Sequence, residues 1–260
     1  MLFQPYEPLV RTPADIDLEY TDIELVAADG TALHGWWLKA KGTPRGSIYF
    51  LHGNAENIST HIASVFWLPA AGYQVLLLDY RGFGRSEGSP YIPAVFLDIQ
   101  AGFEWLLQEP AARNKPIFLF GQSLGAAMAS YLAATDADMQ QALDGVVLES
   151  SFTRYRTITK DVASRHWLTW AFQWPAAWSM PRKYDPLDHI GAISPLPLLL
   201  IHGTQDNIIP FHQAEELFAA AQQPKWLLRY DGPHIGAMAD PELRQAMLDF
   251  MEGRPSSLSQ

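Results

Sequence analysis

The sequence predicts an α/β fold: a mostly parallel sheet of eight strands with helices on both faces. Short apolar runs of β type alternate with helical patterns along most of the chain, and this alternation is typical of parallel sheets covered by helices. The chain has 260 residues, of which 48% are hydrophobic and 18% are charged. That length and composition suit one folded domain with a deep core, so we expect a single domain over residues 1–260.

The first two strands, at residues 23–27 and 33–38, flank Asp29-Gly30, which is a strong signal for an antiparallel hairpin. Six further apolar runs predict strands at residues 47–51, 74–78, 117–120, 145–148, 196–201 and 226–230. Helical patterns lie between them at residues 59–70, 93–107, 124–134, 211–221 and 241–251. Residues 255–260 form a polar tail.

One segment breaks this alternation. Residues 150–195 are too long for a simple crossover between two strands, and they contain four tryptophans at spacings of three and four, Trp167, Trp170, Trp174 and Trp178. On a helix these spacings form one stripe, although Pro175 interrupts it unless a second helix begins there. Two roles stay open and are compatible: the stripe attaches the insertion to the core, or several of its rings line an apolar pocket.

The most informative motif is Gly-Gln-Ser-Leu-Gly at residues 121–125, which lies between a predicted strand and a predicted helix. This is the strand, sharp turn and helix of a nucleophile elbow. Gly121 and Gly125 have no Cβ, so the chain can turn tightly there and hold Ser123 in a strained conformation with its hydroxyl projecting. Ser123 is therefore the candidate nucleophile, and an ordinary turn with an N-capping serine is the alternative.

A serine hydroxyl needs a histidine base and a carboxylate that orients the histidine. The strand at 196–201 is followed by His-Gly-Thr-Gln-Asp, which ends at Asp206, and the strand at 226–230 is followed by Asp-Gly-Pro-His, which ends at His234. The chain order Ser, Asp, His is one of the known orders of such triads. Asp231 is a rival acid, but its place directly before Gly-Pro favours a turn role.

The other seven histidines carry no comparable motif. His52 and His202 both precede a glycine at a strand end and are interpreted as structural, and the rest lack a pattern: His34, His61, His166, His189 and His212. None forms a metal-ligand spacing with another histidine, so we expect no metal site.

Acyl transfer also requires donors for the developing oxyanion. His-Gly-Asn-Ala at residues 52–55 follows the strand at 47–51, where one backbone N–H donor is commonly supplied. The expected donors of this oxyanion hole are the amides of Asn54 and Leu124.

Six stretches together resemble the α/β-hydrolases of the serine esterase and lipase type. They begin at His52 (His-Gly-Asn-Ala), Leu78 (Leu-Asp-Tyr-Arg-Gly-Phe-Gly-Arg-Ser-Glu-Gly), Phe120 (Phe-Gly-Gln-Ser-Leu-Gly), Leu148 (Leu-Glu-Ser-Ser-Phe), His202 (His-Gly-Thr-Gln-Asp) and Gly232 (Gly-Pro-His). The chain most resembles the group named after the yeast Bem46 protein and the monoacylglycerol-lipase-like and serine-aminopeptidase-like hydrolases.

The resemblance implies an α/β-hydrolase fold with a small helical cap formed by residues 150–195. It also implies a carboxylesterase or lipase-like activity on small esters with an apolar acyl group, through Ser123, His234 and Asp206 and without a cofactor. An aminopeptidase or amidase is the alternative, and it needs an acidic group for the substrate amine, for which Glu149 and Asp185 are the candidates. Dehalogenases and epoxide hydrolases are disfavoured because they use an aspartate nucleophile. A binding protein without chemistry is the other class, but no triad member is missing.

Composition excludes several further classes. A net charge of −10 without a basic run argues against a nucleic-acid partner. The absence of cysteine excludes disulfides and thiolate metal sites. The Gly-x-Gly at residues 82–84 has the wrong spacing and prolines downstream for a dinucleotide site.

No apolar stretch approaches the length of a membrane span and no signal peptide is visible. We therefore expect a soluble protein that is cytoplasmic by default. A periplasmic or membrane-anchored protein is the alternative if sequence before Met1 is missing. Peripheral contact with lipid and the oligomeric state stay open.

Overall fold

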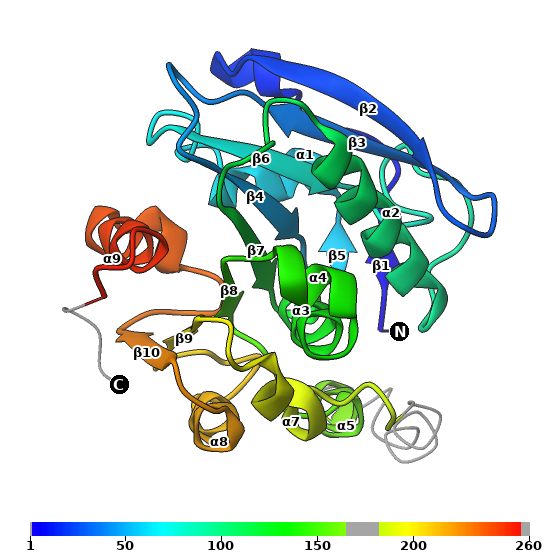
Figure 1. The fold of residues 1–260 in the computed structure, drawn as a ribbon. Helices are drawn as coiled ribbons and strands as arrows, with labels where there is room; N and C mark the ends of the chain where they lie inside the picture. The colour runs from blue at the N-terminus through cyan, green and yellow to red at the C-terminus, as the bar shows by residue number, and fades with distance from the viewer. Residues whose placement is uncertain (1, 165–181, 256–260) are drawn as a thin grey trace. The chain divides into compact units, whose positions relative to one another are not determined.

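The computed structural model describes residues 2–164 and 182–255 (Figure 1). The chain divides into two compact units. Residues 1–121 and 142–144 form the first, called here the N-terminal unit, and residues 122–141 and 145–260 form the second, the C-terminal unit. Both contain mostly parallel strands with helices, so the predicted α/β class with a mostly parallel sheet is confirmed.

The N-terminal unit contains five strands in the order β7-β4-β6-β3-β2. Strand β4 (Gly46–Leu51) pairs in parallel with both β6 (Tyr73–Leu78) and β7 (Ile117–Gln122). The hairpin prediction is confirmed, since β2 (Tyr20–Val26) and β3 (Ala32–Leu38) pair antiparallel. In its turn Asp29 Oδ1 accepts from the backbone N–H and the hydroxyl of Thr31, and Gly30 has a φ of 90°.

Helix α2 (Ala94–Gln108) packs against β2, β4 and β6 of this unit. Its approach is close because Gly102 lies on Tyr49, where an added Cβ would lie 2.3 Å from the Tyr49 hydroxyl oxygen. That hydroxyl donates to the Ile99 carbonyl at 3.1 Å. The unit also contains a small parallel pair, β1 (Gln4–Pro5) with β5 (Ala55–Glu56), and the 3₁₀ helix η1 (Pro13–Ile16).

The helix predicted at residues 59–70 is wrong. The structure has one turn of α-helix, α1 (Ile58–His61), followed by a 3₁₀ turn, η2 (Ile62–Ser64). Past it, the amides of Val65 and Leu68 each bond to the carbonyl three residues back, and the Trp67 indole donates to the Ser64 carbonyl at 3.0 Å. The α-helix therefore ends at His61, and the contact of Trp67 lies beyond that end.

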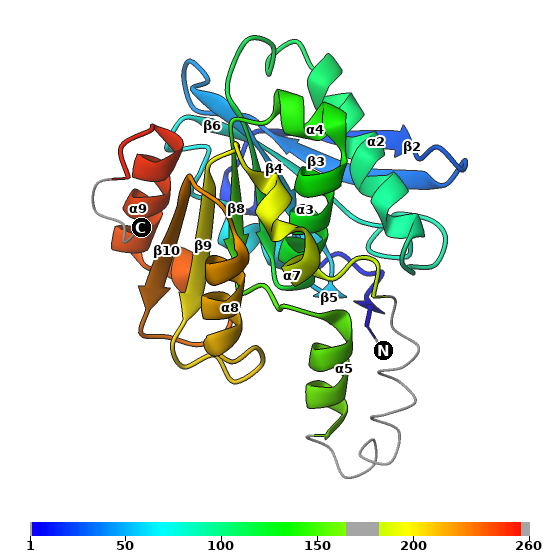
Figure 2. The same cartoon turned by 60° about the horizontal axis from the view of Figure 1, so that its bottom comes forward.

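The C-terminal unit contains three parallel strands in the order β10-β9-β8. They are β8 (Gly145–Glu149), β9 (Leu198–Gly203) and β10 (Lys225–Tyr230). Strand β9 begins two residues later than predicted, because Pro197 has no N–H to donate to a ladder. Helices α8 (His212–Ala220) and α9 (Pro241–Met251) cover opposite faces of β9 and β10 (Figures 1 and 2).

Helix α3 (Leu124–Thr135) packs within this unit against β8, α7 (Pro186–His189) and the 3₁₀ turn η4 (Ile190–Ile193). Its alanines are almost all buried, which permits this close packing. The short helix α4 (Ala137–Ala142) was not predicted, and Asp136 begins it by accepting from the amides of Asp138 and Met139.

The insertion at residues 150–195 is described in part. Helix α5 (Tyr155–Ser164) begins where Asp185 Oδ1 accepts from the Tyr155 amide at 2.9 Å. Residues 165–181, which include the four tryptophans of the predicted stripe, lie outside the described part, so the cap stays a prediction. The last 3₁₀ turn is η5 (Ala237–Ala239). Across residues 2–164 and 182–255, none of the helices is long and apolar enough to cross a membrane.

Candidate active site

Ser123 is the single residue between the end of β7 and the start of α3. Its φ of 55° and ψ of −116° lie in a region that side-chain-bearing residues rarely adopt. Two hydrogen bonds hold it there: its amide donates to the Glu149 carbonyl at 2.9 Å, and its carbonyl accepts from the Ala127 amide at 3.1 Å. The backbone at Ser123 is therefore strained and fixed, as a nucleophile elbow requires.

The amide of Leu124 is the first amide of α3, and such amides have no acceptor within their own helix. The Ser123 amide is already used by Glu149, so the Leu124 amide fits the expected role of oxyanion donor. Asn54 belongs to the N-terminal unit, where its carbonyl accepts from the Gln4 amide at 2.7 Å. The joint action of the Asn54 and Leu124 amides stays a prediction.

Asp206 and His234 lie in the loops that follow β9 and β10, and their side chains meet. The distance from His234 Nδ1 to Asp206 Oδ2 is 2.7 Å. A carboxylate only accepts, so Nδ1 carries the proton and Nε2 keeps a free lone pair. The Asp206 side chain is fully buried and that of His234 is 13% exposed. The imidazole is therefore oriented as a general base must be.

Two backbone amides and the ring of His202 also contact the Asp206 carboxylate. Oδ1 accepts from the amides of Ile208 and Ile209, both at 2.8 Å, and His202 Nε2 lies 3.4 Å from Oδ2. Burial alone would raise the pKa of the Asp206 carboxyl, but hydrogen bonds from His202 and His234 outweigh burial and hold that pKa well below its usual value. Asp206 is therefore ionised while it orients His234.

His202, interpreted from the sequence as structural, thus also contacts the candidate acid. Its Nε2 lies 2.8 Å from the Ile209 carbonyl, and since a carbonyl only accepts, Nε2 carries the proton. The side chain is 1% exposed. Its position fixes the loop that carries Asp206.

The loop that carries His234 is held by Tyr230, the last residue of β10. The Tyr230 hydroxyl donates to the Pro233 carbonyl at 2.6 Å and accepts from the Gly236 amide at 2.8 Å. Between these two anchors Ile235 has a φ of 53°, a costly conformation for a β-branched residue. The approach of this loop to the Asp206 loop requires Gly203, where an added Cβ would lie 2.3 Å from the Gly232 carbonyl oxygen.

Asp231, the rival acid, is exposed. Its Oδ1 accepts from the side chains of Gln205 at 2.7 Å and Thr204 at 3.3 Å. These contacts join the two loops at the surface, which is a turn role of the kind that its sequence position suggests.

Two buried residues beside Ser123 have contacts that the sequence reasoning missed: it considered Glu149 only as a binder of a substrate amine and did not single out Gln122. Glu149 ends β8 and is fully buried. Its Oε2 accepts from Gln122 Nε2 at 2.6 Å, and its Oε1 accepts from the Ala237 amide at 3.0 Å. The Leu-Glu-Ser-Ser-Phe motif at the end of a strand was a signal for this residue.

Both carboxylates considered for an amine-binding role are engaged inside the protein. Glu149 has the contacts just given, and Asp185 is 2% exposed and accepts from the Tyr155 amide and from Arg154 Nη1. Neither therefore presents a carboxylate to a substrate amine.

His52, interpreted from the sequence as structural, is held by local contacts. His52 is fully buried, stacks on Tyr80 with ring centroids 4.1 Å apart, and has its Nδ1 2.8 Å from the Gly53 carbonyl. Burial lowers the pKa of His52 well below its ordinary value. Within residues 2–164 and 182–255, no group of three His, Cys, Asp or Glu side chains is placed to hold a metal ion.

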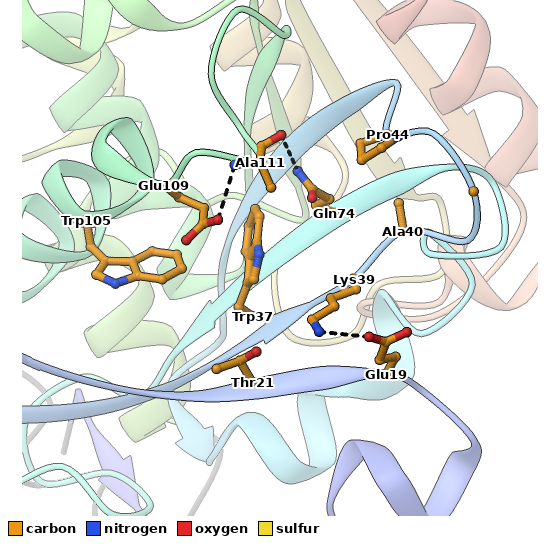
Figure 3. Close-up of a pocket in the computed structure, with 11 residues that line it drawn as sticks. Glu19, Thr21, Trp37, Lys39, Ala40, Pro44, Gln74, Trp105, Glu109 and Ala111 are labelled. Atoms are coloured by element: carbon orange, nitrogen blue, oxygen red, sulfur yellow. Dashed lines mark hydrogen bonds and ion pairs between the residues drawn. The ribbon is translucent and has the colours of Figure 1, made fainter.

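A cavity of about 490 Å³ lies in the N-terminal unit, near the amino-terminal end of β6 (Figure 3). Trp37 and Trp105 meet edge to face there, and most of the polar side chains that line the cavity bond to other groups of the protein. Lys39 pairs with Glu19, Gln74 donates to the Ala111 carbonyl, and Glu109 accepts from the Ala111 amide. The cavity therefore belongs to the N-terminal unit, whereas Asp206 and His234 follow strands of the C-terminal unit.

Comparison with known proteins shows the family of the chain. The family model described as serine aminopeptidase, S33, matches residues 42–187. The uncharacterized protein YfhR of Escherichia coli (strain K12) is 33% identical over 237 residues, which cover 88% of this chain and 79% of that protein.

Two other comparisons carry a named activity. The lysophosphatidylserine lipase ABHD12 of Xenopus tropicalis is 30% identical over 235 residues, covering 83% of this chain and 60% of that protein. Among solved structures, the Pyrococcus furiosus esterase Pf2001 has a TM-score of 0.81 at 22% identity and covers 98% of both chains, a likeness that shows the fold. The chain therefore belongs to the serine aminopeptidase S33 family of the α/β-hydrolase superfamily.

Proposed function

We propose that this hydrolase cleaves carboxylic esters through a Ser-His-Asp triad and an acyl-enzyme. The observation that carries the proposal is the His234–Asp206 pair, a buried carboxylate 2.7 Å from an imidazole, in the same unit as a serine held at a positive φ. An elbow serine with an oriented imidazole base is the arrangement that acyl transfer needs.

The reaction follows from the atoms available. Ser123 Oγ attacks the ester carbonyl carbon while His234 Nε2 takes the hydroxyl proton, and the amides of Asn54 and Leu124 stabilise the oxyanion. The imidazolium then gives its proton to the leaving alcohol, and an acyl-enzyme remains. Water, deprotonated by the same imidazole, releases the acid and restores Ser123.

We further propose that the tryptophans of the insertion bind the acyl group. Trp167, Trp170, Trp174 and Trp178 supply an apolar surface in the segment where α/β-hydrolases insert a cap. An apolar acyl chain matches such a surface. The substrate class is therefore a small ester with an apolar acyl group, and the lipase ABHD12 among the relatives supports this choice.

An aminopeptidase is the second candidate, and the description of the matching family favours it. Recognition of a free amine needs a carboxylate that faces the substrate. Glu149 and Asp185 are both engaged in internal hydrogen bonds, which supports the ester reading over the peptidase reading.

A panel of p-nitrophenyl esters of increasing chain length, run beside an aminoacyl p-nitroanilide, tests the proposal. We expect turnover of the esters and little turnover of the anilide, with Ser123→Ala as the inactive control. Anilide turnover above that of every ester would contradict the proposal and favour a peptidase.

A further inference from the structure

The carboxylate of Glu149 contacts both segments that carry the proposed chemistry. On one side Oε2 accepts from Gln122, the residue before Ser123, at 2.6 Å. On the other side Oε1 accepts from the amide of Ala237, in the loop that carries His234, at 3.0 Å. The backbone of the same residue accepts from the Ser123 amide at 2.9 Å. One residue thus touches the nucleophile segment twice and the histidine loop once.

The histidine loop needs such an anchor. Ile235 follows His234 at a φ of 53°, a conformation that persists only where the surroundings hold it. Tyr230 fixes Pro233 and Gly236, and Glu149 fixes the next amide, that of Ala237. Without Glu149, the Ala237 amide would lose the hydrogen bond that connects the histidine loop to the nucleophile segment.

The charge of Glu149 also acts on the site. The titratable groups that face it are His234, His202 and Tyr230, with Asp206 beyond the two histidines. Burial raises the pKa of Glu149, and the hydrogen bonds from Gln122 and Ala237 oppose that rise only in part. Both oxygens accept from N–H donors, which is the pattern of a carboxylate. By Coulomb's law, a negative charge at this position stabilises a positive charge on a neighbouring group.

We propose that ionised Glu149 is a positioning residue that ties the nucleophile elbow to the histidine loop. It rests on the proposed function, since positioning has meaning only if Ser123 and His234 react. Glu149 does not touch substrate and takes no proton in the reaction. Its contribution is the placement of the two groups that do.

Three variants test this role. Glu149→Gln keeps the shape but has one accepting oxygen for two donors and no charge, so kcat should fall about 10²-fold, as expected when reacting groups are misplaced. The acid limb of the kcat/KM profile should move to lower pH, because the imidazolium loses a nearby negative charge. Glu149→Asp keeps the charge but is too short for both donors, so kcat should fall while the limb stays in place.

The third variant exchanges the partners. In Glu149→Gln combined with Gln122→Glu, the amide at 149 donates to the carboxylate at 122 and still accepts from Ala237. This exchange should restore at least tenfold of the lost kcat and return the acid limb toward its wild-type position. Asp185→Asn is the matched control, another buried carboxyl in the same unit whose contacts involve Tyr155 and Arg154. It should leave the limb in place.

The titration of His234 provides a readout that needs no turnover. Its ring signals, assigned by their loss in His234→Asn, are followed by NMR in wild type and in Glu149→Gln. If Glu149→Gln does not fold, the exchanged pair and Glu149→Asp replace it in both measurements.

A lower His234 titration midpoint in Glu149→Gln, restored in the exchanged pair, supports the proposal. An unchanged midpoint with wild-type kcat overturns it, and so does a loss of kcat with an unmoved midpoint and no rescue, which marks a packing defect. Wild-type protein that turns over no ester contradicts the proposed function instead, and the NMR arm still decides the role of Glu149.

Discussion

Two clusters of buried charge, one in each unit, are built differently. In the N-terminal unit Arg81 lies between two carboxylates: its Nη2 is 2.6 Å from Asp98 Oδ1, and its Nη1 is 2.7 Å from Asp29 Oδ2. The Arg81 side chain is 4% exposed and that of Asp98 is fully buried. Each guanidinium nitrogen donates to a carboxylate, so each nitrogen of the Arg81 guanidinium has an acceptor within the cluster.

The cluster of the C-terminal unit leaves one position open. Asp206 uses both oxygens on amides and imidazoles. The imidazole it orients is partly exposed, and among residues 2–164 and 182–255 no hydrogen bond reaches its Nε2. The Arg81 cluster, called closed here, joins segments of the chain. The Asp206 cluster, called open here, contains a histidine that can exchange a proton with a substrate. Buried charge alone therefore does not identify a candidate active site. A buried charge that orients a group able to accept a proton, here His234 Nε2, does.

The largest effect should come from the open cluster. Asp206→Asn keeps an oxygen for the amides of Ile208 and Ile209 but turns an NH₂ toward His234 Nδ1, which favours the wrong tautomer. We expect kcat for esters to fall about 10⁴-fold. Steady-state kinetics check this, with Asp231→Asn as the matched control, since Asp231 is exposed and contacts only Thr204 and Gln205 among the hydrogen bonds described. A harmless Asp206→Asn beside a damaging Asp231→Asn would reverse the assignment.

The closed cluster should show its effect in stability instead. Asp98→Asn leaves a buried guanidinium without its main partner, which should cost about 3–5 kcal/mol of unfolding free energy. Urea unfolding measures the loss, and kcat per folded molecule should stay near wild type. Glu19→Gln is the control, because it breaks the exposed Lys39 pair and should cost less than about 1 kcal/mol. A large loss of kcat in folded Asp98→Asn protein would remove the contrast between the clusters.

A smaller effect concerns pH and stability. The pKa of Asp206 is lower in the folded protein than in the unfolded chain, so its ionisation stabilises the fold above the unfolded value. That contribution is lost as the pH falls below about 4 toward the folded value. The difference in unfolding free energy between wild type and Asp206→Asn should shrink between pH 6 and pH 3 in urea titrations, as estimated from the ordinary aspartate range of about 4. A difference in unfolding free energy that does not change with pH would mean that the contacts of Asp206 do not lower its pKa.

The smallest effects per group belong to the tryptophans of the insertion. Each methylene that the acyl pocket buries is worth about 0.8 kcal/mol, or roughly fourfold in kcat/KM, until the pocket is full. Trp170→Ala and Trp174→Ala should flatten or shift this dependence on chain length and leave acetate ester hydrolysis nearly intact. An unchanged length profile in the double variant would limit the stripe to a packing role.

The sequence predicts those parts of the site that are local in the chain. Ser123, Asp206 and His234 each follow a recognisable strand, and their motifs are short enough to be seen without the fold. Glu149 could not be assigned in this way, because its contact with Ala237 joins residues 88 positions apart. Its motif marked a strand end but gave no partner.

The same reasoning applies to the fold. All eight predicted strands are present, since apolar periodicity is a local signal. The helix expected at residues 59–70 ends at His61, where a 3₁₀ turn begins, and apolar periodicity does not reveal that end. Pro197 delays β9 by its missing N–H, a signal that was visible in the sequence.

The central claim is that Ser123 is the nucleophile of an open, histidine-activated cluster. A fluorophosphonate probe, followed by intact mass and peptide mapping, tests it most directly, because the probe reacts covalently with an activated serine. The account predicts one adduct per chain, on Ser123, that is absent in Ser123→Ala protein with wild-type unfolding behaviour. Undiminished labelling of Ser123→Ala, or an adduct mapped to another residue, would contradict it.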